Sequence, residues 1–313
     1  MMSKPLVIVA GPTAVGKSAL SIELAKRING SVISADSMQV YRGMDIGTAK
    51  ITNDEMQGIT HYVIDVLDPH EDFNIVRFQE MAKEAIDDIL SSGRIPIMAG
   101  GTGFYIQSVL YDIDFTYGVE LTEYREYLQN LIDEKGSEYV HDMLKVADPD
   151  AADAIHHNDH KRMIRALEYN RQTGGTISQH NRESADRRAC YDHCYFVLND
   201  ERSAIYERID KRVDVMIEEG LEAEVRNLLS TGLTKDNVSM HGLGYKEMID
   251  YIEGRCTLDE AIYKIKRDSR HFAKRQLTWF KREKDVIWLN RNEDTDIIGT
   301  MIKHLEKRGI INE

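Results

Sequence analysis

Short apolar runs alternate with amphipathic stretches over the first third of the chain, and similar runs return later. The runs are rich in Val and Ile and are bounded by polar residues or glycine, which is typical of strands buried on both faces. They are Leu6–Ala10, Ser31–Ala35, Tyr62–Val66, Ile95–Ala99, Tyr195–Leu198 and Val286–Leu289. The stretches Gly16–Ile28 and Ile75–Ser91 have helical spacing. This alternation predicts an α/β fold with a parallel sheet flanked by helices, in which ligands bind at the carboxyl ends of the strands.

The middle of the chain has a different pattern. From about residue 116 to residue 192 no stretch reads as a strand, and helical patterns are separated by Gly136 and Gly174. Further helices are expected over 201–231, 242–253 and 257–283. We therefore predict a core made of residues 1–115 and 190–313, interrupted by a helical insertion domain at 116–189.

Composition and charge narrow the class of protein. The 313 residues carry a net charge of −13, which argues against a protein that coats nucleic acid nonspecifically. Basic residues are nevertheless concentrated, with a local excess of +6 over 255–284 and of +3 over 158–188. Such islands favour selective contact with a polyanion. Neither a membrane-spanning run nor a signal peptide is found, and the three cysteines make no disulfide framework, so we expect a cytoplasmic protein.

The first apolar run leads directly into GPTAVGKS, residues 11–18, which fits the P-loop pattern G-x-x-x-x-G-K-[ST]. In such a loop the backbone N–H groups surround a phosphate, the lysine reaches its outer oxygens, and the serine hydroxyl can hold Mg²⁺. Strand, loop and helix follow one another here in the required order. The prediction is therefore a P-loop NTPase-like sheet that binds a di- or triphosphate.

Three other strand ends carry candidate chemistry. Asp36 follows the second run and could accept a proton from an attacking group, although Asp is also a good cap for a turn or helix. Thr102 follows a Gly-Gly turn after the fourth run, where backbone N–H groups could meet an oxyanion. Asp65 either positions a metal ion or belongs to the turn before Asp68 and Pro69.

Two helical segments carry candidate cationic contacts. Arg208 and Arg212 lie one turn apart and could clamp a diphosphate or pair with neighbouring acids. In the last long helix, basic residues are expected on an outward face and apolar residues on the opposite face. The predicted basic ridge consists of Arg267, Arg270, Lys274 and Lys281.

Taken together, these stretches resemble the tRNA dimethylallyltransferases, also called tRNA isopentenyltransferases. The resemblance rests on GPTAVGKS, SADSMQVYRGMDIGTAK, HYVIDVLDP, AGGTGFYI, NDHKRMIRALE, RIDKRVDVMIEEGL, GLGYKE and AKRQLTWFKR, which occur in the family's order from residue 7 to about residue 289. It implies transfer of a dimethylallyl group from dimethylallyl diphosphate to the exocyclic N6 amine of the adenosine 3′ to the anticodon. The bacterial type is expected, because the zinc finger of some eukaryotic members is not found before Glu313.

The resemblance also implies roles for individual residues. The diphosphate would be bound by the P-loop residues Gly11, Pro12, Thr13, Ala14, Val15, Gly16, Lys17 and Ser18, with Mg²⁺ at Ser18. Catalysis would involve Asp36 as the base, Thr102, Lys17 and an arginine, with Arg212 favoured over Arg208. The predicted tRNA contacts are Asp36, Ser37, Met38, Gln39, Thr102, Tyr124, His160, Lys161, Arg162, Met163, Ile164, Arg267, Arg270, Lys274, Arg275 and Gln276. Gln39 is expected to hydrogen-bond to the edge of an adenine base. The enzyme is expected to be a monomer.

The chain departs from the family at His156-His157-Asn158-Asp159, where HPND is common, and at Gly174-Gly175-Thr176, where Gly-Lys-Pro is usual. Two rival functions share some of these features. A P-loop kinase of a small metabolite would leave the basic helix unexplained. A noncatalytic RNA-binding ATPase would leave no purpose for Asp36 beside the P-loop.

Overall fold

The computed structural model describes residues 4–115, 122–185, 188–294 and 296–312. The chain forms two compact units, one made of residues 1–110 with 189–313 and the other of residues 111–188. The expected start of the insertion at residue 116 lies outside the described residues. Each unit has an apolar core of its own.

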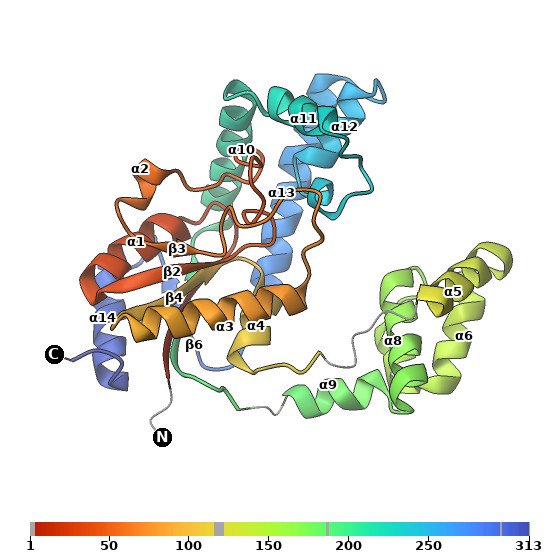
Figure 1. Ribbon diagram of the computed structural model, residues 1–313, viewed down its shortest axis with the longest axis horizontal. Coiled ribbons are helices and arrows are strands. Elements are labelled where there is room, and N and C mark those ends of the chain that lie inside the picture. The colour runs from red at the N-terminus through yellow and green to blue at the C-terminus, as the bar shows by residue number, and fades with distance from the viewer. Residues whose placement is uncertain (1–3, 116–121, 186–187, 295, 313) are drawn as a thin grey trace. The chain divides into compact units, whose positions relative to one another are not determined.

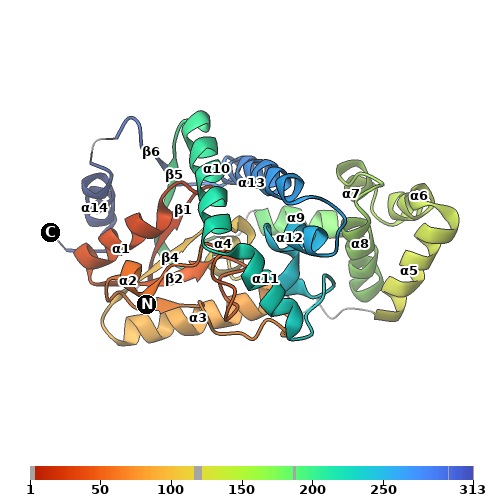
Figure 2. The same ribbon diagram turned by 90° about the horizontal axis from the view of Figure 1, so that it is seen from above.

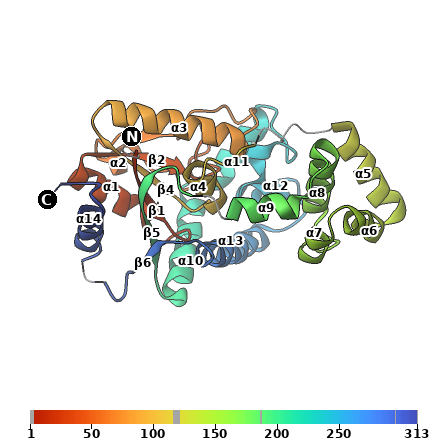
Figure 3. The same cartoon turned by 90° about the horizontal axis from the view of Figure 1, so that it is seen from below.

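The first unit is built on a six-stranded sheet in which every neighbouring pair is parallel. Its order is β3-β2-β4-β1-β5-β6, of which Figure 1 shows β3, β2 and β4 and Figure 3 shows β2, β4, β1, β5 and β6. The strands are β1 (Pro5–Ala10), β2 (Gly30–Ala35), β3 (His61–Tyr62), β4 (Ile95–Gly100), β5 (Asp192–Asn199) and β6 (Val286–Asn290). The predicted parallel α/β sheet is therefore confirmed.

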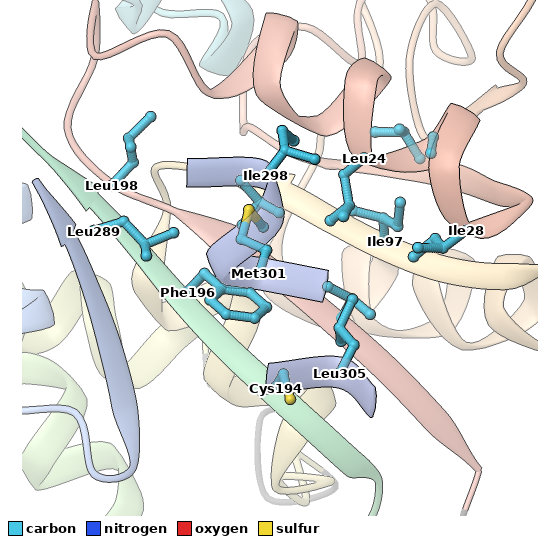
Figure 4. Close-up of a cluster of buried hydrophobic side chains, with 14 of the residues drawn as sticks. Leu24, Ile28, Ile97, Cys194, Phe196, Leu198, Leu289, Ile298, Met301 and Leu305 are labelled. Atoms are coloured by element: carbon cyan, nitrogen blue, oxygen red, sulfur yellow. The ribbon is translucent and has the colours of Figure 1, made fainter. Parts of the chain in front are cut away.

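One face of this sheet is covered by α1 (Lys17–Ile28) and α14 (Ile297–Arg308). Alternate residues of the strands point to these helices, including Val7 and Val9 of β1 and Phe196 of β5. They pack against Leu24 of α1 and Met301 of α14, all buried (Figure 4). The cluster includes Val15 of the P-loop and the second half of α1, so it fixes the loop and the helix that follows it against the sheet.

The remaining helices of this unit lie on the other face and around the carboxyl edge of the sheet. They are α2 (Asn53–Met56), α3 (Ile75–Ser91), α4 (Gly103–Leu110), α10 (Arg202–Glu218), α11 (Leu221–Ser230), α12 (Tyr245–Ile252) and α13 (Leu258–Phe280), with a 3-10 turn at Val238–His241. Helices α10 and α13 lie side by side (Figure 2). Helix α13 begins with a capping box in which Thr257 and Glu260 bond each other's backbone N–H groups.

Two predicted elements need correction. The strand expected over Tyr62–Val66 ends at Tyr62, because Val63 and Asp65 have left-handed backbone conformations (φ of 59° and 54°) that end strand pairing. The single helix expected over 201–231 is divided into α10 and α11 at Gly220, which has a φ of 99°. In both places a residue with positive φ ends the element, although the pattern of apolar residues in the sequence continues beyond it.

The second unit is helical, as predicted. It contains α5 (Thr122–Lys135), α6 (Ser137–Ala147), α7 (Pro149–Ala154), α8 (His160–Thr173) and α9 (Ile177–Ala185) (Figure 3). Leu128, Leu144 and Leu167 belong to its own apolar core. An internal ion pair adds to it, since Arg125 donates twice to the fully buried carboxylate of Glu168 at 2.7 and 2.9 Å.

Across the described part of the chain, no helix is both long enough and apolar enough to span a membrane.

Candidate active site

A cavity of about 1160 Å³ opens at the carboxyl ends of β1, β2 and β4. Its wall includes the P-loop, Asp36 after β2 and the Gly100-Gly101 turn after β4. Arg212 of α10 and Gln276 of α13 complete it on the side of the two long helices. The cavity therefore lies where a parallel sheet of this kind binds its ligand.

Three carbonyl groups of the P-loop accept hydrogen bonds from cationic side chains, one within the loop and two from outside it. The contacts are Lys17 Nζ to the carbonyl of Pro12 (2.7 Å), Arg208 Nε to that of Ala14 (2.9 Å) and Arg291 Nη1 to that of Val15 (2.9 Å). In the part of the chain that the structure describes, no acceptor is found for the N–H groups of residues 14–18. These donors and the N-terminus of α1 form a ready site for an anion.

Gly11 allows the loop to start this close to the sheet. A Cβ atom at this position would lie 2.4 Å from the carbonyl oxygen of Leu198 on β5. Its φ of 147° is also unfavourable for other residues. The first glycine of the motif is thus required by close backbone approach.

Lys17 is poised to respond to a phosphate group. Burial lowers the pKa of its ammonium group to about 8, and the positive charge of Arg212 acts in the same direction, while the charge of Asp36 opposes the shift. A bound diphosphate would supply the missing negative charge and favour the protonated lysine.

The protein without ligand should therefore lose affinity for inorganic diphosphate as the pH rises through about 8. Lys17 is charged below this pKa and neutral above it, so affinity at pH 9 should be about tenfold lower than at pH 7 if only the charged form binds. Calorimetric titration across this range measures the effect. Lys17→Arg should remove the decline, and an unchanged decline in that variant would assign it to another group.

Asp36 acts as a cap in this structure and also lines the cavity. Its Oδ1 atom accepts hydrogen bonds from the N–H groups of Met38 (2.9 Å) and Gln39 (3.4 Å), so it caps the turn after β2. No partner for Oδ2 is found within the described ranges, and Asp36 lines the cavity. Its charge opposes the lowering of the pKa of both Lys17 and Arg212, which places the carboxylate near these two cationic side chains.

Thr102 lies at a neighbouring strand end. Its N–H group donates to the carbonyl of Ala35 at 3.3 Å, so the turn after β4 is tied to the residue that precedes Asp36. Thr102 then starts α4, where its carbonyl accepts from the N–H of Tyr105 at 2.9 Å. The structure thus brings Asp36 and Thr102 to adjacent positions at one edge of the sheet.

The two arginines of α10 have different surroundings. Arg212 lines the cavity, and its Nη1 donates to the Thr13 hydroxyl at 3.3 Å. Arg208 is bonded to Asp200 (2.7 Å) and to the Ala14 carbonyl, behind the loop. The guanidinium of Arg208 thus supports the loop and is not among the groups lining the cavity, which agrees with the preference for Arg212, while a diphosphate contact by either arginine stays a prediction.

A second wall of the cavity is anchored by Glu224, which no sequence motif singles out. Its carboxylate accepts from the N–H groups of Asp45 (2.8 Å), Ile46 (2.8 Å) and Gly47 (3.0 Å). It also accepts from the hydroxyl of buried Tyr245 at 2.7 Å. In the sequence, Glu224 lies 177–179 residues from the three backbone groups that it binds, so this contact can be identified only in the folded structure.

Gln39 and Lys50 brace the same wall. The Gln39 amide donates to the carbonyls of Thr48 and Ala49, both at 3.3 Å, and accepts from Ser34. The predicted reading of an adenine edge by Gln39 does not fit these contacts, which occupy both ends of the amide. Lys50 has a buried side chain and donates to Asp65 at 2.5 Å. Asp65 is thus a turn residue in an ion pair, and it is not among the residues lining the cavity.

Helix α13 departs from the predicted basic ridge. Arg270 pairs with Asp210 of α10 at 2.5 Å, and Arg267 is bonded to its neighbour Asp268 at 2.8 Å. The acids of α10 were not expected near this helix. Lys274 and Arg275 are exposed, and neither forms an ion pair with any residue that the structure describes. Gln276 is buried, which excludes it as an exposed tRNA contact.

In the helical unit the predicted tRNA contacts are only partly accessible. His160 is half-buried, and Lys161 and Arg162 are exposed at the start of α8. The side chains of Met163 and Ile164 are buried in the unit's core, so their predicted place in a tRNA-contact segment would depend on the backbone or on their neighbours. The same core packs Tyr124, whose ring also lies 4.7 Å from the guanidinium of Arg171. In the first unit, Ser37 and Met38 are half-buried beside Asp36.

Comparison with known proteins places these features in a family. Residues 39–283 match the sequence model described as IPP transferase. A tRNA dimethylallyltransferase of Lachnoclostridium phytofermentans is 57% identical over 311 residues, covering 98% of this chain and 99% of that protein.

Solved structures agree with this match. The full-length tRNA isopentenylpyrophosphate transferase of Bacillus halodurans is 43% identical with a TM-score of 0.73, and 98% of each chain is covered. A eukaryotic dimethylallyltransferase acting on tRNA is 30% identical with a TM-score of 0.83, covering 98% of this chain and 79% of that one. None of these similarities supports a metabolite kinase.

Proposed function

The chain belongs to the IPP transferase family, and from that membership we propose that it transfers a dimethylallyl group from dimethylallyl diphosphate to tRNA. The acceptor is the exocyclic N6 amine of the adenosine 3′ to the anticodon, and diphosphate is released. The observation that carries the proposal is the position of Asp36 beside a P-loop whose N–H groups, Lys17 and Arg212 can hold a diphosphate.

Bond formation and bond breaking can be assigned to atoms. The adenine nitrogen attacks the allylic C1 carbon, the bond between C1 and the diphosphate oxygen breaks, and the electron pair leaves with the diphosphate. Donors aimed at that leaving group lower the barrier, because negative charge increases there as the bond breaks. The N–H groups of residues 14–18, Lys17 and Arg212 supply those donors.

Asp36 accepts the proton that the amine loses. An exocyclic adenine amine is too weak an acid to be deprotonated first, so the transfer accompanies attack. The cap leaves Oδ2 available for this purpose, while the bonds at Oδ1 fix the carboxylate in place. Thr102, at the adjacent strand end, is positioned to contact the acceptor.

Mg²⁺ is the ion expected at the P-loop, where Ser18 is the side-chain ligand proposed for it. The described residues contain no cluster of three or more His, Cys, Asp or Glu side chains suited to a metal. This fits Mg²⁺ in a P-loop, which commonly takes one hydroxyl, phosphate oxygens and waters. Ser18, exposed at the start of α1, would hold it. When bound, the ion neutralises charge on the leaving diphosphate.

The test is transfer of label from dimethylallyl diphosphate to unmodified tRNA, with Mg²⁺ and without ATP. Incorporation at the adenosine 3′ to the anticodon, lost on chelation, is the expected result. A tRNA with guanosine at that position is the matched control. Consumption of ATP against small metabolites, without incorporation into tRNA, would instead favour a kinase.

Exposed cations on α13 should contribute to tRNA affinity. Replacing both Lys274 and Arg275 by alanine should weaken binding and reduce the slope of log K against log salt, by about 0.7–0.9 for each phosphate that is no longer neutralised. Filter binding of an anticodon stem-loop at several salt concentrations measures this. Arg270→Ala is the control, because removing its pair with Asp210 should lower stability and leave the slope unchanged. An unchanged slope in the double variant would make these residues ordinary surface charges.

A further inference from the structure

Gln276 lies near the C-terminal end of α13, four residues before Phe280, with only 7% of the residue exposed. Its side chain is bonded at both ends. The Oε1 atom accepts from the N–H of Thr13 at 2.9 Å, and the Nε2 atom donates to the carbonyl of Gly101 at 3.0 Å. A buried amide with both ends paired holds its neighbours in fixed geometry.

The turn after β4 is adapted to this contact. A Cβ atom placed on Gly101 would lie 2.1 Å from Nε2 of Gln276 and 3.4 Å from the carbonyl oxygen of Gly11. The absence of a side chain at residue 101 therefore lets the turn, the amide and the P-loop meet. Substitution there would displace the bridge.

In the proposed reaction, the two loops that Gln276 joins serve different substrates. The P-loop binds the diphosphate donor, and the turn after β4 lies beside the acceptor. Thr13 lies in the P-loop, and its hydroxyl accepts from Arg212. Gly101 precedes Thr102, whose N–H is bonded to the residue before Asp36. The other side-chain supports of the P-loop, Arg208 and Arg291, bond its carbonyls and not this turn.

We propose that Gln276 is a positioning residue, which sets the distance between the diphosphate in the P-loop and the acceptor beside Thr102 and Asp36. This inference rests on the proposed function. In a displacement reaction, the reacting atoms must approach to about 3–3.5 Å, and an error of about 1 Å can lower the rate by about 10²-fold. A side chain that spans both loops controls that separation without contacting either reacting atom.

The test compares two buried glutamines. Gln276→Met keeps the length of the side chain but removes both hydrogen bonds, and Gln276→Glu cannot donate to the Gly101 carbonyl. Gln79→Met is the matched control, because Gln79 is also 7% exposed and donates to a backbone carbonyl, that of Ser108, at 2.6 Å. Thermal unfolding of all three reports the general loss of stability.

For Gln276→Met we expect single-turnover transfer to slow by about 30–100-fold. The Kd values for diphosphate and for an anticodon stem-loop should change less than about threefold, since each loop keeps its own binding groups. Gln276→Glu should be at least as slow, and Gln79→Met should remain within about twofold of the parent rate at similar stability. A parent-like rate in Gln276→Met, an equal loss in the control, or a loss confined to RNA affinity would overturn the inference.

Hydrogen exchange separates this outcome from failure of the proposed function. If the parent enzyme transfers no dimethylallyl group, the proposed function fails. The effect of Gln276 on the two loops can still be measured by the exchange rates of their backbone amide hydrogens. Gln276→Met should speed exchange in both the P-loop and residues 100–102, whereas Gln79→Met should change neither. Faster exchange in only one of the two loops would contradict a bridge that positions them together.

Discussion

Replacing Asp36 by Asn should lower kcat by about 10²–10⁴-fold, the usual contribution of a positioned general base. The amide oxygen can still accept from the N–H of Met38, so the turn after β2 should persist. It cannot take the proton from the attacking amine. Binding of diphosphate and of an anticodon stem-loop should therefore stay within about threefold of the parent values, and rapid-quench transfer measures the chemical step.

Glu55→Gln provides the control for charge in the same cavity. Glu55 also lines it, but its carboxylate is used in the capping box with Thr52. The transfer rate of the Glu55→Gln variant should fall by no more than a few fold. A transfer rate within tenfold of the parent in Asp36→Asn would remove Asp36 as the base and leave it as a cap.

Glu224→Ala should destabilise the protein strongly. It leaves the N–H groups of residues 45–47 and the hydroxyl of Tyr245 without their shared acceptor. A buried polar group left unpaired costs about 1–3 kcal/mol, and a total of about 2–4 kcal/mol is expected, because Tyr245 is buried, Ile46 and Gly47 are half-buried and water can reach the exposed N–H of Asp45. Chemical denaturation measures it.

The neighbouring acid on α11 offers the comparison. Glu222 pairs with exposed Arg226, and no other partner is found among the residues that the structure describes, so Glu222→Ala should cost less than about 1 kcal/mol. Because the 45–47 loop lines the cavity, Glu224→Ala should also weaken donor binding at temperatures where the protein is still folded. Equal stability of the two alanine variants would mean that the loop is held by other contacts.

Features with a local pattern were predictable from the sequence. The P-loop and five of the strands were located because apolar runs and glycine spacing carry the information within a few residues. The strand predicted over Tyr62–Val66 was too long, because Val63 and Asp65 adopt left-handed backbone conformations that their residue types do not predict. Such conformations are imposed by tertiary contacts, here including the ion pair of Asp65 with Lys50.

Residue roles that depend on distant partners could not be predicted in the same way. Helical spacing placed Arg270 on an outward face, but packing of α13 against α10 brings Asp210 to it. The same spacing cannot show that Gln276 reaches two loops or that Arg208 turns behind the P-loop. Sequence spacing identifies a helix face, while the neighbouring element decides whether that face is free.

The two ends of the helical insertion meet within the sheet-containing unit, where the N–H of Cys190 donates to the carbonyl of Leu110 at 2.9 Å. The sheet-containing unit is therefore continuous across the point of insertion, and each unit has a core of its own. Chains with more than one core commonly depart from two-state unfolding. We therefore expect each core to contribute its own calorimetric transition on heating, so one midpoint temperature does not describe the stability of the protein.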